Sequence, residues 1–210
     1  MKKIFLLWVI YSCSILFTFA QSSLPPVYEI KSDTALSQKL DSSYWQKLED
    51  KEGKWTFDDV SKSPLSEKFH IKGLKAAGID TNKIYTVWTR YRLRNTMSHD
   101  ANFSLTSYVD YYDVYLVKSD SSIVHYKSGF LRKWEEKDGL KSAGDANVPG
   151  IGPGAIPFVL KPGEEILIYD KRFRHKNPNF NVSVRILNTE KLIRENYIDY
   201  VDNRENYFGK

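Results

Sequence analysis

Hydrophobic and polar positions alternate with a period of two through much of the chain after residue 84. The clearest run covers 84–94, where one face is apolar and the other carries Thr86, Trp88, Arg90, Arg92 and Arg94. Because successive side chains of a strand point to opposite sides of a sheet, this run predicts a half-buried strand. Similar runs predict further strands at 27–30, 103–109, 113–117, 123–126, 156–160, 165–169 and 182–187.

Turn-forming residues separate these runs, as in Lys127-Ser128-Gly129 and Lys161-Pro162-Gly163. Seven or eight short strands without intervening helices are typical of an antiparallel sandwich. The chain also contains 14 Tyr, 11 Phe and 5 Trp but only 2 Met, and aromatic residues favour strands. We therefore expect an all-β fold.

Three stretches lack this alternation. Residues 31–43 are polar with a weak helical period. Residues 44–70 scatter aromatic side chains among charges, so we expect them to fold over one sheet, with Asp58 and Asp59 opening a short helix or turn. Residues 141–155, which are rich in Gly and Pro, form the longest predicted loop, and long loops on a sandwich often carry function.

The N-terminus has the pattern of an export signal. Lys2 and Lys3 precede an apolar run, 4–19, that ends at Ala20, which predicts a signal peptide at 1–20. A membrane anchor is the alternative, but polar residues interrupt the run and no basic cluster follows it. We expect an exported protein, periplasmic or on the extracytoplasmic face of the membrane. Cleavage after Ala20 would leave a chain without cysteine and therefore without disulfides.

Charge does not point to nucleic acid. The chain has 31 basic and 26 acidic residues, and removal of Lys2 and Lys3 leaves 29 basic residues and a net charge of about +3. Basic side chains gather at 90–94 and 171–176. Such groups in an exported protein are typical of a solvated strand face. Nucleic acid is therefore not an expected partner.

Residue patterns of known catalytic sites are missing from the sequence. The four histidines are widely separated, and Gly150, Gly152 and Gly154 do not have the spacing of a dinucleotide-binding loop. No Gly-x-Ser-x-Gly elbow is present. Acidic pairs such as Asp110 with Asp113 do not exclude a glycosidase, because the sequence cannot show how far apart two carboxyl groups lie across a cleft. We expect no catalytic residue, no metal and no cofactor, and hence no enzyme.

The candidate chemistry is that of ligand binding. The predicted ligand-binding residues are Trp88, Arg90, Arg92, Arg132 and Trp134. The first three share one strand face, and the last two lie in the loop after Gly129. Aromatic faces stack on sugar rings, and guanidinium groups bind carboxylate or phosphate. The alternative is that segment 44–70 covers Trp88 and the arginines solvate its edge.

Several motifs follow one another in the order found in a known family. They are Leu48-Glu49-Asp50, Trp55-Thr56-Phe57-Asp58-Asp59-Val60, Val87-Trp88-Thr89-Arg90-Tyr91-Arg92-Leu93-Arg94-Asn95, Tyr112-Asp113-Val114-Tyr115-Leu116, Ser128-Gly129 and Ile156-Pro157-Phe158-Val159-Leu160-Lys161-Pro162-Gly163-Glu164. Over residues 27–188 the chain resembles the extracellular sensing domain of bacterial 7TMR-DISM receptors, which are seven-transmembrane receptors with diverse intracellular signalling modules. The sharpest motif combines Trp88, Arg90 and Asn95.

The resemblance implies an antiparallel jelly-roll sandwich similar to carbohydrate-binding modules. It also implies non-catalytic sensing of a carbohydrate or other small molecule, with a histidine kinase or cyclic-dinucleotide enzyme as the intracellular output. The expected organisation is a signal peptide at 1–20, a sensing domain at 21–190 and a C-terminal segment at 191–210. Because that segment contains no membrane-spanning run, we expect either a sensor truncated at the membrane or a stand-alone soluble module. The alternative function is a secreted carbohydrate-active enzyme or its accessory carbohydrate-binding module.

Overall fold

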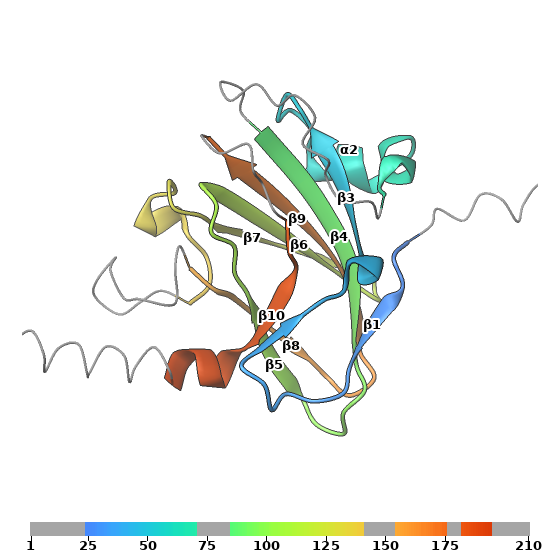
Figure 1. The fold of residues 1–210 in the computed structure, drawn as a ribbon, viewed down its shortest axis with the longest axis vertical. Helices are drawn as coiled ribbons and strands as arrows, with labels where there is room; N and C mark the ends of the chain where they lie inside the picture. The colour runs from blue at the N-terminus through green and yellow to red at the C-terminus, as the bar shows by residue number, and fades with distance from the viewer. Residues whose placement is uncertain (1–23, 71–84, 141–153, 176–181, 195–210) are drawn as a thin grey trace, which may run out of the picture.

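The computed structural model describes residues 24–70, 85–140, 154–175 and 182–194. Within them, ten strands form two sheets that pack face to face (Figure 1). Sheet A contains β1 (Val27–Ile30), β4 (Tyr85–Asn95), β9 (Glu165–Arg174), β6 (Tyr111–Lys118) and β7 (Ile123–Ser128) in that order, with β3 (Trp45–Asp50) also paired to β4. Sheet B contains β2 (Ser37–Lys39), β10 (Arg185–Asn188), β5 (Ala101–Leu105) and β8 (Ile156–Leu160).

The order of the strands is that of a jelly roll. From β4 onward the chain alternates between the sheets, except at the β6–β7 hairpin, and the four-stranded order β2-β10-β5-β8 faces the order β4-β9-β6-β7. Eight strands in two such sheets are the jelly-roll arrangement. The predicted all-β, antiparallel jelly-roll sandwich is therefore confirmed. Two strands are additions: β3 and the parallel β1 share one edge of β4, along 86–91 and 92–95 respectively.

The main hydrophobic core lies between the sheets. In β4 the predicted alternation holds, because Val87, Tyr91 and Leu93 point inward and are fully buried. Sheet B contributes side chains such as Phe103 and Ile186 from the opposite layer. Each such side chain stabilises the fold by roughly 1.5–3 kcal/mol relative to exposure.

A second, smaller core covers part of the outer face of sheet A. Leu48, Val60, Phe69, Trp88 and Tyr169 form it, because the segment after β3 folds back over the sheet. This segment contains the short helix α2 (Phe57–Ser61) and the 3-10 turn η2 (Leu65–Lys68), and a further 3-10 turn, η1 (Ser42–Tyr44), precedes β3. Figure 1 shows α2 beside β3 and β4. The predicted wrapping of residues 44–70 is confirmed for the part after β3, whereas Trp45–Asp50 form a strand of the sheet itself.

The start of α2 follows from local hydrogen bonds. The Thr56 hydroxyl accepts from the backbone N–H of Asp59, and the Asp59 carboxylate accepts from the backbone N–H of Thr56. This reciprocal capping satisfies two backbone donors at the helix start. The short helix expected at Asp58 and Asp59 is therefore confirmed, with Phe57 as its first residue.

Some of the predicted elements differ from the observed ones. The weak helical period at 31–43 was misleading, because this stretch contains β2 and η1, and Trp45–Asp50 is a strand that the irregular pattern concealed. Strand β9 continues to Arg174, although its second half is basic. The physical reason is that this half pairs with β4 on one edge and β6 on the other, and that Arg172 points into the sandwich, where it forms an ion pair with Asp170 (Nε–Oδ1 2.7 Å).

The remaining predictions concern the two ends of the chain and the long loop, which the structure describes only in part. The proposed signal peptide at 1–20, residues 141–153 of the predicted loop and residues 195–210 of the C-terminal segment lie outside the described residues. Among the residues that are described, no helix has the length and apolar character needed to cross a bilayer.

Candidate functional site

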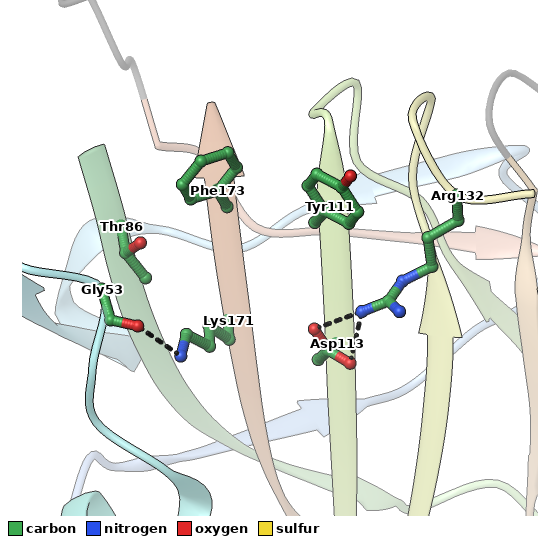
Figure 2. A pocket seen from close by; sticks show the side chains of 7 residues that line it. All are labelled: Gly53, Thr86, Tyr111, Asp113, Arg132, Lys171 and Phe173. Carbon is green, nitrogen blue, oxygen red and sulfur yellow. Dashed lines mark hydrogen bonds and ion pairs between the residues drawn. The ribbon is translucent and has the colours of Figure 1, made fainter. Parts of the chain in front are cut away.

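A pocket of about 280 Å³ opens on the outer face of sheet A (Figure 2). It lies next to the covered region, the part of this face where Trp88, Arg90 and Tyr169 are buried beneath the segment after β3. The pocket is lined by Gly53, Thr86, Tyr111, Asp113, Arg132, Lys171 and Phe173. The size is at the lower end of the usual range for ligand sites. A pocket of this kind fits one small ring or a molecule of similar size.

Strand alternation places most of the lining. Tyr111 and Asp113 are two residues apart on β6, and Lys171 and Phe173 are two apart on β9, so each pair points to the same side of the sheet. The register sets Tyr111 opposite Phe173 and Asp113 opposite Lys171. The rings of Tyr111 and Phe173 meet edge to face with centroids 5.6 Å apart and form the apolar wall.

A turn after β3 supplies the wall nearest to Lys171. The buried Asp50 carboxylate accepts from the backbone N–H groups of Lys54 (3.2 Å) and Trp55 (2.8 Å), which fixes the turn. The Lys171 ammonium then donates to the carbonyl oxygens of Trp55 (2.7 Å) and Gly53 (3.3 Å). Gly53 has a φ of +69°, and a Cβ there would lie 3.1 Å from Thr86 Oγ1, so this position favours glycine for two reasons.

Arg132 closes the opposite side of the pocket from the loop after β7. Its Nη2 donates to both oxygens of Asp113 (2.8 and 2.7 Å), and its Nε donates to the carbonyl of Ser128 (3.0 Å). The loop leaves β7 through Gly129, which has a φ of +121° and lies so close to Asp110 that a Cβ would be 2.4 Å from its carbonyl oxygen. The guanidinium group reaches Asp113 because only glycine permits this turn.

Asp113 is the centre of a small electrostatic cluster. Besides Arg132, its Oδ1 contacts His125 Nε2 at 3.0 Å. His125 stacks on Tyr115 with ring centroids 4.2 Å apart, and Tyr115 stacks on Phe57 at 4.5 Å. Burial, and then the nearby Asp113 carboxylate, raise the pKa of Tyr115 to about 12. The phenol therefore remains neutral at any physiological pH and acts as a polar ring rather than a base.

The pocket also contains an unused polar atom. Thr86 Oγ1 is buried and makes no hydrogen bond to the described residues. A buried hydroxyl without a partner is unfavourable. A water molecule or a ligand oxygen in the pocket could satisfy it.

The five residues predicted to bind ligand are not brought together. Arg132 lines the pocket, whereas Trp88 and Arg90 are buried beneath the segment after β3. Trp88 lies under the pocket wall, with the Lys171 ammonium 5.2 Å from its ring centroid. Their burial matches the alternative expectation that segment 44–70 covers Trp88.

The remaining two predicted residues lie elsewhere. Arg92 lies near the end of β4 that pairs with β1, and its Nε donates to Glu165 Oε1 (2.8 Å). Arg94 donates to the other oxygen of the same carboxylate, Oε2. The Trp134 backbone belongs to the 3-10 turn η3 (Trp134–Glu136), and its side chain lies outside the described part of the structure. A ligand-binding role for the five residues stays a prediction.

Sequence reasoning missed most of the pocket. Asp113 was considered only as one of an acidic pair with Asp110, Phe173 was not singled out, and the basic group at 171–176 was interpreted as a solvated face. Extension of the period-two pattern from Glu165 through Phe173 would have placed Lys171 and Phe173 on one face with Tyr169. The contribution of Gly53 has no comparable signal, because it depends on how a separate segment packs on the sheet.

The described residues contain no group of three or more His, Cys, Asp or Glu arranged to hold a metal ion. Asp113 is the only carboxylate among the residues that line the pocket. The polar atoms of the pocket are thus suited to hydrogen bonding and charge recognition of a ligand.

Comparison with protein families finds a match over residues 42–191, with the family described as 7TMR-DISM extracellular 2. The chain belongs to this family. The match spans β3 to β10, and hence every strand of the two sheets except β1 and β2, together with the whole pocket. The resemblance to the 7TMR-DISM sensing domain is therefore confirmed.

Membership of the 7TMR-DISM extracellular 2 family identifies the domain as an extracellular sensing domain of a receptor. It places the domain outside the cytoplasm, and it implies transmembrane and intracellular modules in the receptor. Comparison with curated proteins finds no match to the chain.

Proposed function

We propose that this domain is a non-catalytic sensor that binds a carbohydrate or other small polar molecule in the pocket over β4, β9 and β6, between the turn after β3 and the loop after β7. The observation that carries the proposal is the pocket itself. It combines an aromatic wall, Tyr111 with Phe173, and polar groups at two ends, Lys171 and the Asp113–Arg132 pair. Aromatic walls with a few placed polar groups are typical of sugar and small-molecule sites.

The single carboxylate supports sensing over catalysis. A glycosidase of the common kind needs two carboxyl groups across the scissile bond. Asp113 has no second carboxylate among the lining residues, and both of its oxygens accept from Arg132. The alternative of a secreted carbohydrate-active enzyme is therefore the weaker proposal. We further propose a periplasmic location after cleavage of residues 1–20 and a histidine kinase or a cyclic-dinucleotide enzyme as the intracellular output.

The experiment is a thermal-shift screen of the purified chain against oligosaccharides and small metabolites, with product analysis of every hit. A ligand that binds only the native state raises the melting temperature, so we expect stabilisation without product. Tyr111→Ala should abolish the shift, because it removes half of the aromatic wall. Tyr108→Ala is the matched control, since Tyr108 is 57% exposed and does not line the pocket. Equal shifts in both variants, or turnover of a hit, would overturn the proposal.

A further inference from the structure

Two opposite charges face each other across β6 and β9 without forming an ion pair. Asp113 and Lys171 are direct cross-strand partners on the outer face. Partners in such positions have Cβ atoms about 4.5–5.5 Å apart and commonly attract one another when oppositely charged. Here the side chains turn away from each other: Lys171 reaches the Gly53 and Trp55 carbonyls, and Asp113 reaches Arg132 and His125 (Figure 2). The pocket occupies the space between the two diverging side chains.

The Lys171 end of the pocket has an uncompensated positive charge. An ammonium group has three N–H donors, and two of those of Lys171 go to the neutral carbonyls of Gly53 and Trp55. The Trp88 ring, whose centroid is 5.2 Å from the ammonium, is also neutral, so the groups that contact Lys171 carry no full negative charge. No carboxylate of the described residues lies within 4 Å of Lys171 Nζ. Lys171 has only a weak effect on the Asp59 carboxylate. Hydrogen bonds from Thr56 are the main cause that lowers the pKa of Asp59, and the charge of Lys171 is the smallest cause.

The Asp113 end is electrically balanced. The Arg132 guanidinium and the Asp113 carboxylate form a bidentate pair in which both side chains are about 15% exposed. A neutral pair of this type offers acceptor and donor atoms side by side, which suits hydroxyl groups better than a full charge. The lining residues thus carry two positive charges and one negative charge, with the excess at Lys171.

We propose that the ligand of this pocket is a sugar acid, a polyhydroxylated ring with one carboxylate, whose carboxylate binds Lys171 and whose hydroxyl groups bind Asp113 and Arg132. This inference rests on the proposed sensing function and adds the charge of the ligand. A single excess positive charge matches a monoanion. A phosphate would bring close to two negative charges against one lysine and would approach the Asp113 carboxylate. The ring would lie against Tyr111 and Phe173.

The test is calorimetric titration of the full chain with galacturonate, glucuronate, mannuronate and guluronate, each beside its neutral parent sugar, and with glucose 6-phosphate. We expect at least one uronate to bind roughly 10–100-fold more tightly than its neutral parent, the gain of a hydrogen-bonded charge. Added salt should weaken binding of the uronate more than binding of the neutral sugar. These comparisons need no variant and are therefore independent of any folding defect.

Three variants locate the charge. Lys171→Met should remove the preference for the uronate, and Lys171→Arg should keep most of it because the charge remains. Lys127→Met is the matched control: Lys127 is exposed, lies on the same face opposite Asp113 and is outside the pocket, so its loss should leave the preference unchanged.

The outcomes separate the two proposals. If neutral sugars bind as tightly as their acids and Tyr111→Ala abolishes both, the sensing function stands and the acidic ligand is overturned. Tighter binding of glucose 6-phosphate than of any uronate also overturns it, as does an equal loss in Lys171→Met and Lys127→Met. If no sugar binds at all, the acidic-sugar inference falls, and the broader screen decides the sensing function.

Discussion

The outer face of sheet A contains two neighbouring regions built from the same kinds of side chain. In the covered region, Trp88, Arg90 and Tyr169 lie beneath Phe57 and Phe69 and are almost fully buried. In the pocket, defined by its seven lining residues, aromatic and cationic side chains surround an open space instead. The difference lies in the segment after β3. It packs on the first region and borders the pocket at Gly53 and Trp55, whose carbonyls accept from Lys171.

The comparison shows that aromatic and arginine residues on a strand face do not by themselves identify a binding surface. Trp88 and Arg90 are residue types common in sugar-binding sites. Here the Phe69 ring lies over the Arg90 guanidinium, 4.3 Å from ring centroid to guanidinium carbon, and occupies the space that a stacked ligand would need. Lys171 belongs to both regions, since it contacts the Trp88 ring from one side and lines the pocket on the other. The covered region thus helps to hold Lys171 at the edge of the neighbouring pocket.

The largest expected effect is in the covered region. Trp88→Ala should destabilise the domain by about 3–5 kcal/mol, because it empties a large volume in the outer core. Urea denaturation monitored by circular dichroism measures the change. Tyr111→Ala, a large truncation in the pocket, should cost much less because its ring borders open space. Equal losses would mean that the two regions do not differ in packing.

Gly129→Ala should come next, at roughly 2–3 kcal/mol, from backbone strain and the clash with the Asp110 carbonyl. Gly163→Ala is the matched control: Gly163 also has a positive φ, +76°, but nothing lies within 4 Å of the added methyl group. Its cost should be only about 1–2 kcal/mol. Because Gly129 directs the Arg132 loop, its variant should also lose ligand-induced stabilisation. If both variants lost stability equally, close packing at Gly129 would not matter.

Arg90→Met should destabilise the domain by roughly 2 kcal/mol, since it removes a buried charged hydrogen bond to Gln46 (2.7 Å) and the contact with Phe69. Removal of an arginine that only solvated the strand face would be nearly neutral, within about 0.5 kcal/mol. Arg132→Met leaves the mostly buried Asp113 carboxylate without its main partner and should cost roughly 1–3 kcal/mol, but unlike Arg90→Met it should also abolish the ligand-induced shift. Loss of the ligand-induced shift in Arg90→Met but not in Arg132→Met would contradict the division into covered region and pocket.

The smallest effect concerns the charged end of the same face, where Glu165 binds Arg92 and Arg94. Burial opposes ionisation of Glu165, but the two guanidinium groups outweigh it and lower its pKa. A lowered pKa stabilises the fold above the unfolded value and loses this contribution as the pH falls through the folded value. Glu165→Gln should therefore cost less than about 1 kcal/mol at pH 7.

The pH dependence checks this assignment. The difference between Glu165→Gln and the wild-type chain should vanish below the folded pKa of Glu165, where the wild-type carboxyl is neutral. Glu52→Gln, at a side chain that is 71% exposed, should cause no measurable change at any pH. A constant difference for Glu165→Gln from pH 7 to pH 3 would show that its effect is not electrostatic.

The alternation of residues along the chain was enough to predict the sandwich. In β6 the side chains of Tyr112, Val114 and Leu116 are apolar and buried, and the residues between them are half-buried, because one face of the strand packs on the core. In β4 the same alternation places Val87, Tyr91 and Leu93 in the core between the sheets. The strand at 156–160 was predicted with the observed bounds for the same reason. β3 was missed because it is buried on both faces, so Gln46, Lys47 and Leu48 show no alternation between buried and exposed positions.

The sequence by itself therefore determined the layers of this protein and the face to which each residue of its regular strands points. These properties depend on neighbours along the chain, whose directions are set by strand geometry. Whether a polar, aromatic face is covered or open was decided only by the tertiary structure, since it depends on where residues 51–70 pack. Lys171 is the clearest case: it lies beyond the predicted strand at 165–169, in a basic group that was interpreted as solvated, but its charge faces a pocket because the carbonyls of Gly53 and Trp55, 118 and 116 residues away, draw it from Asp113.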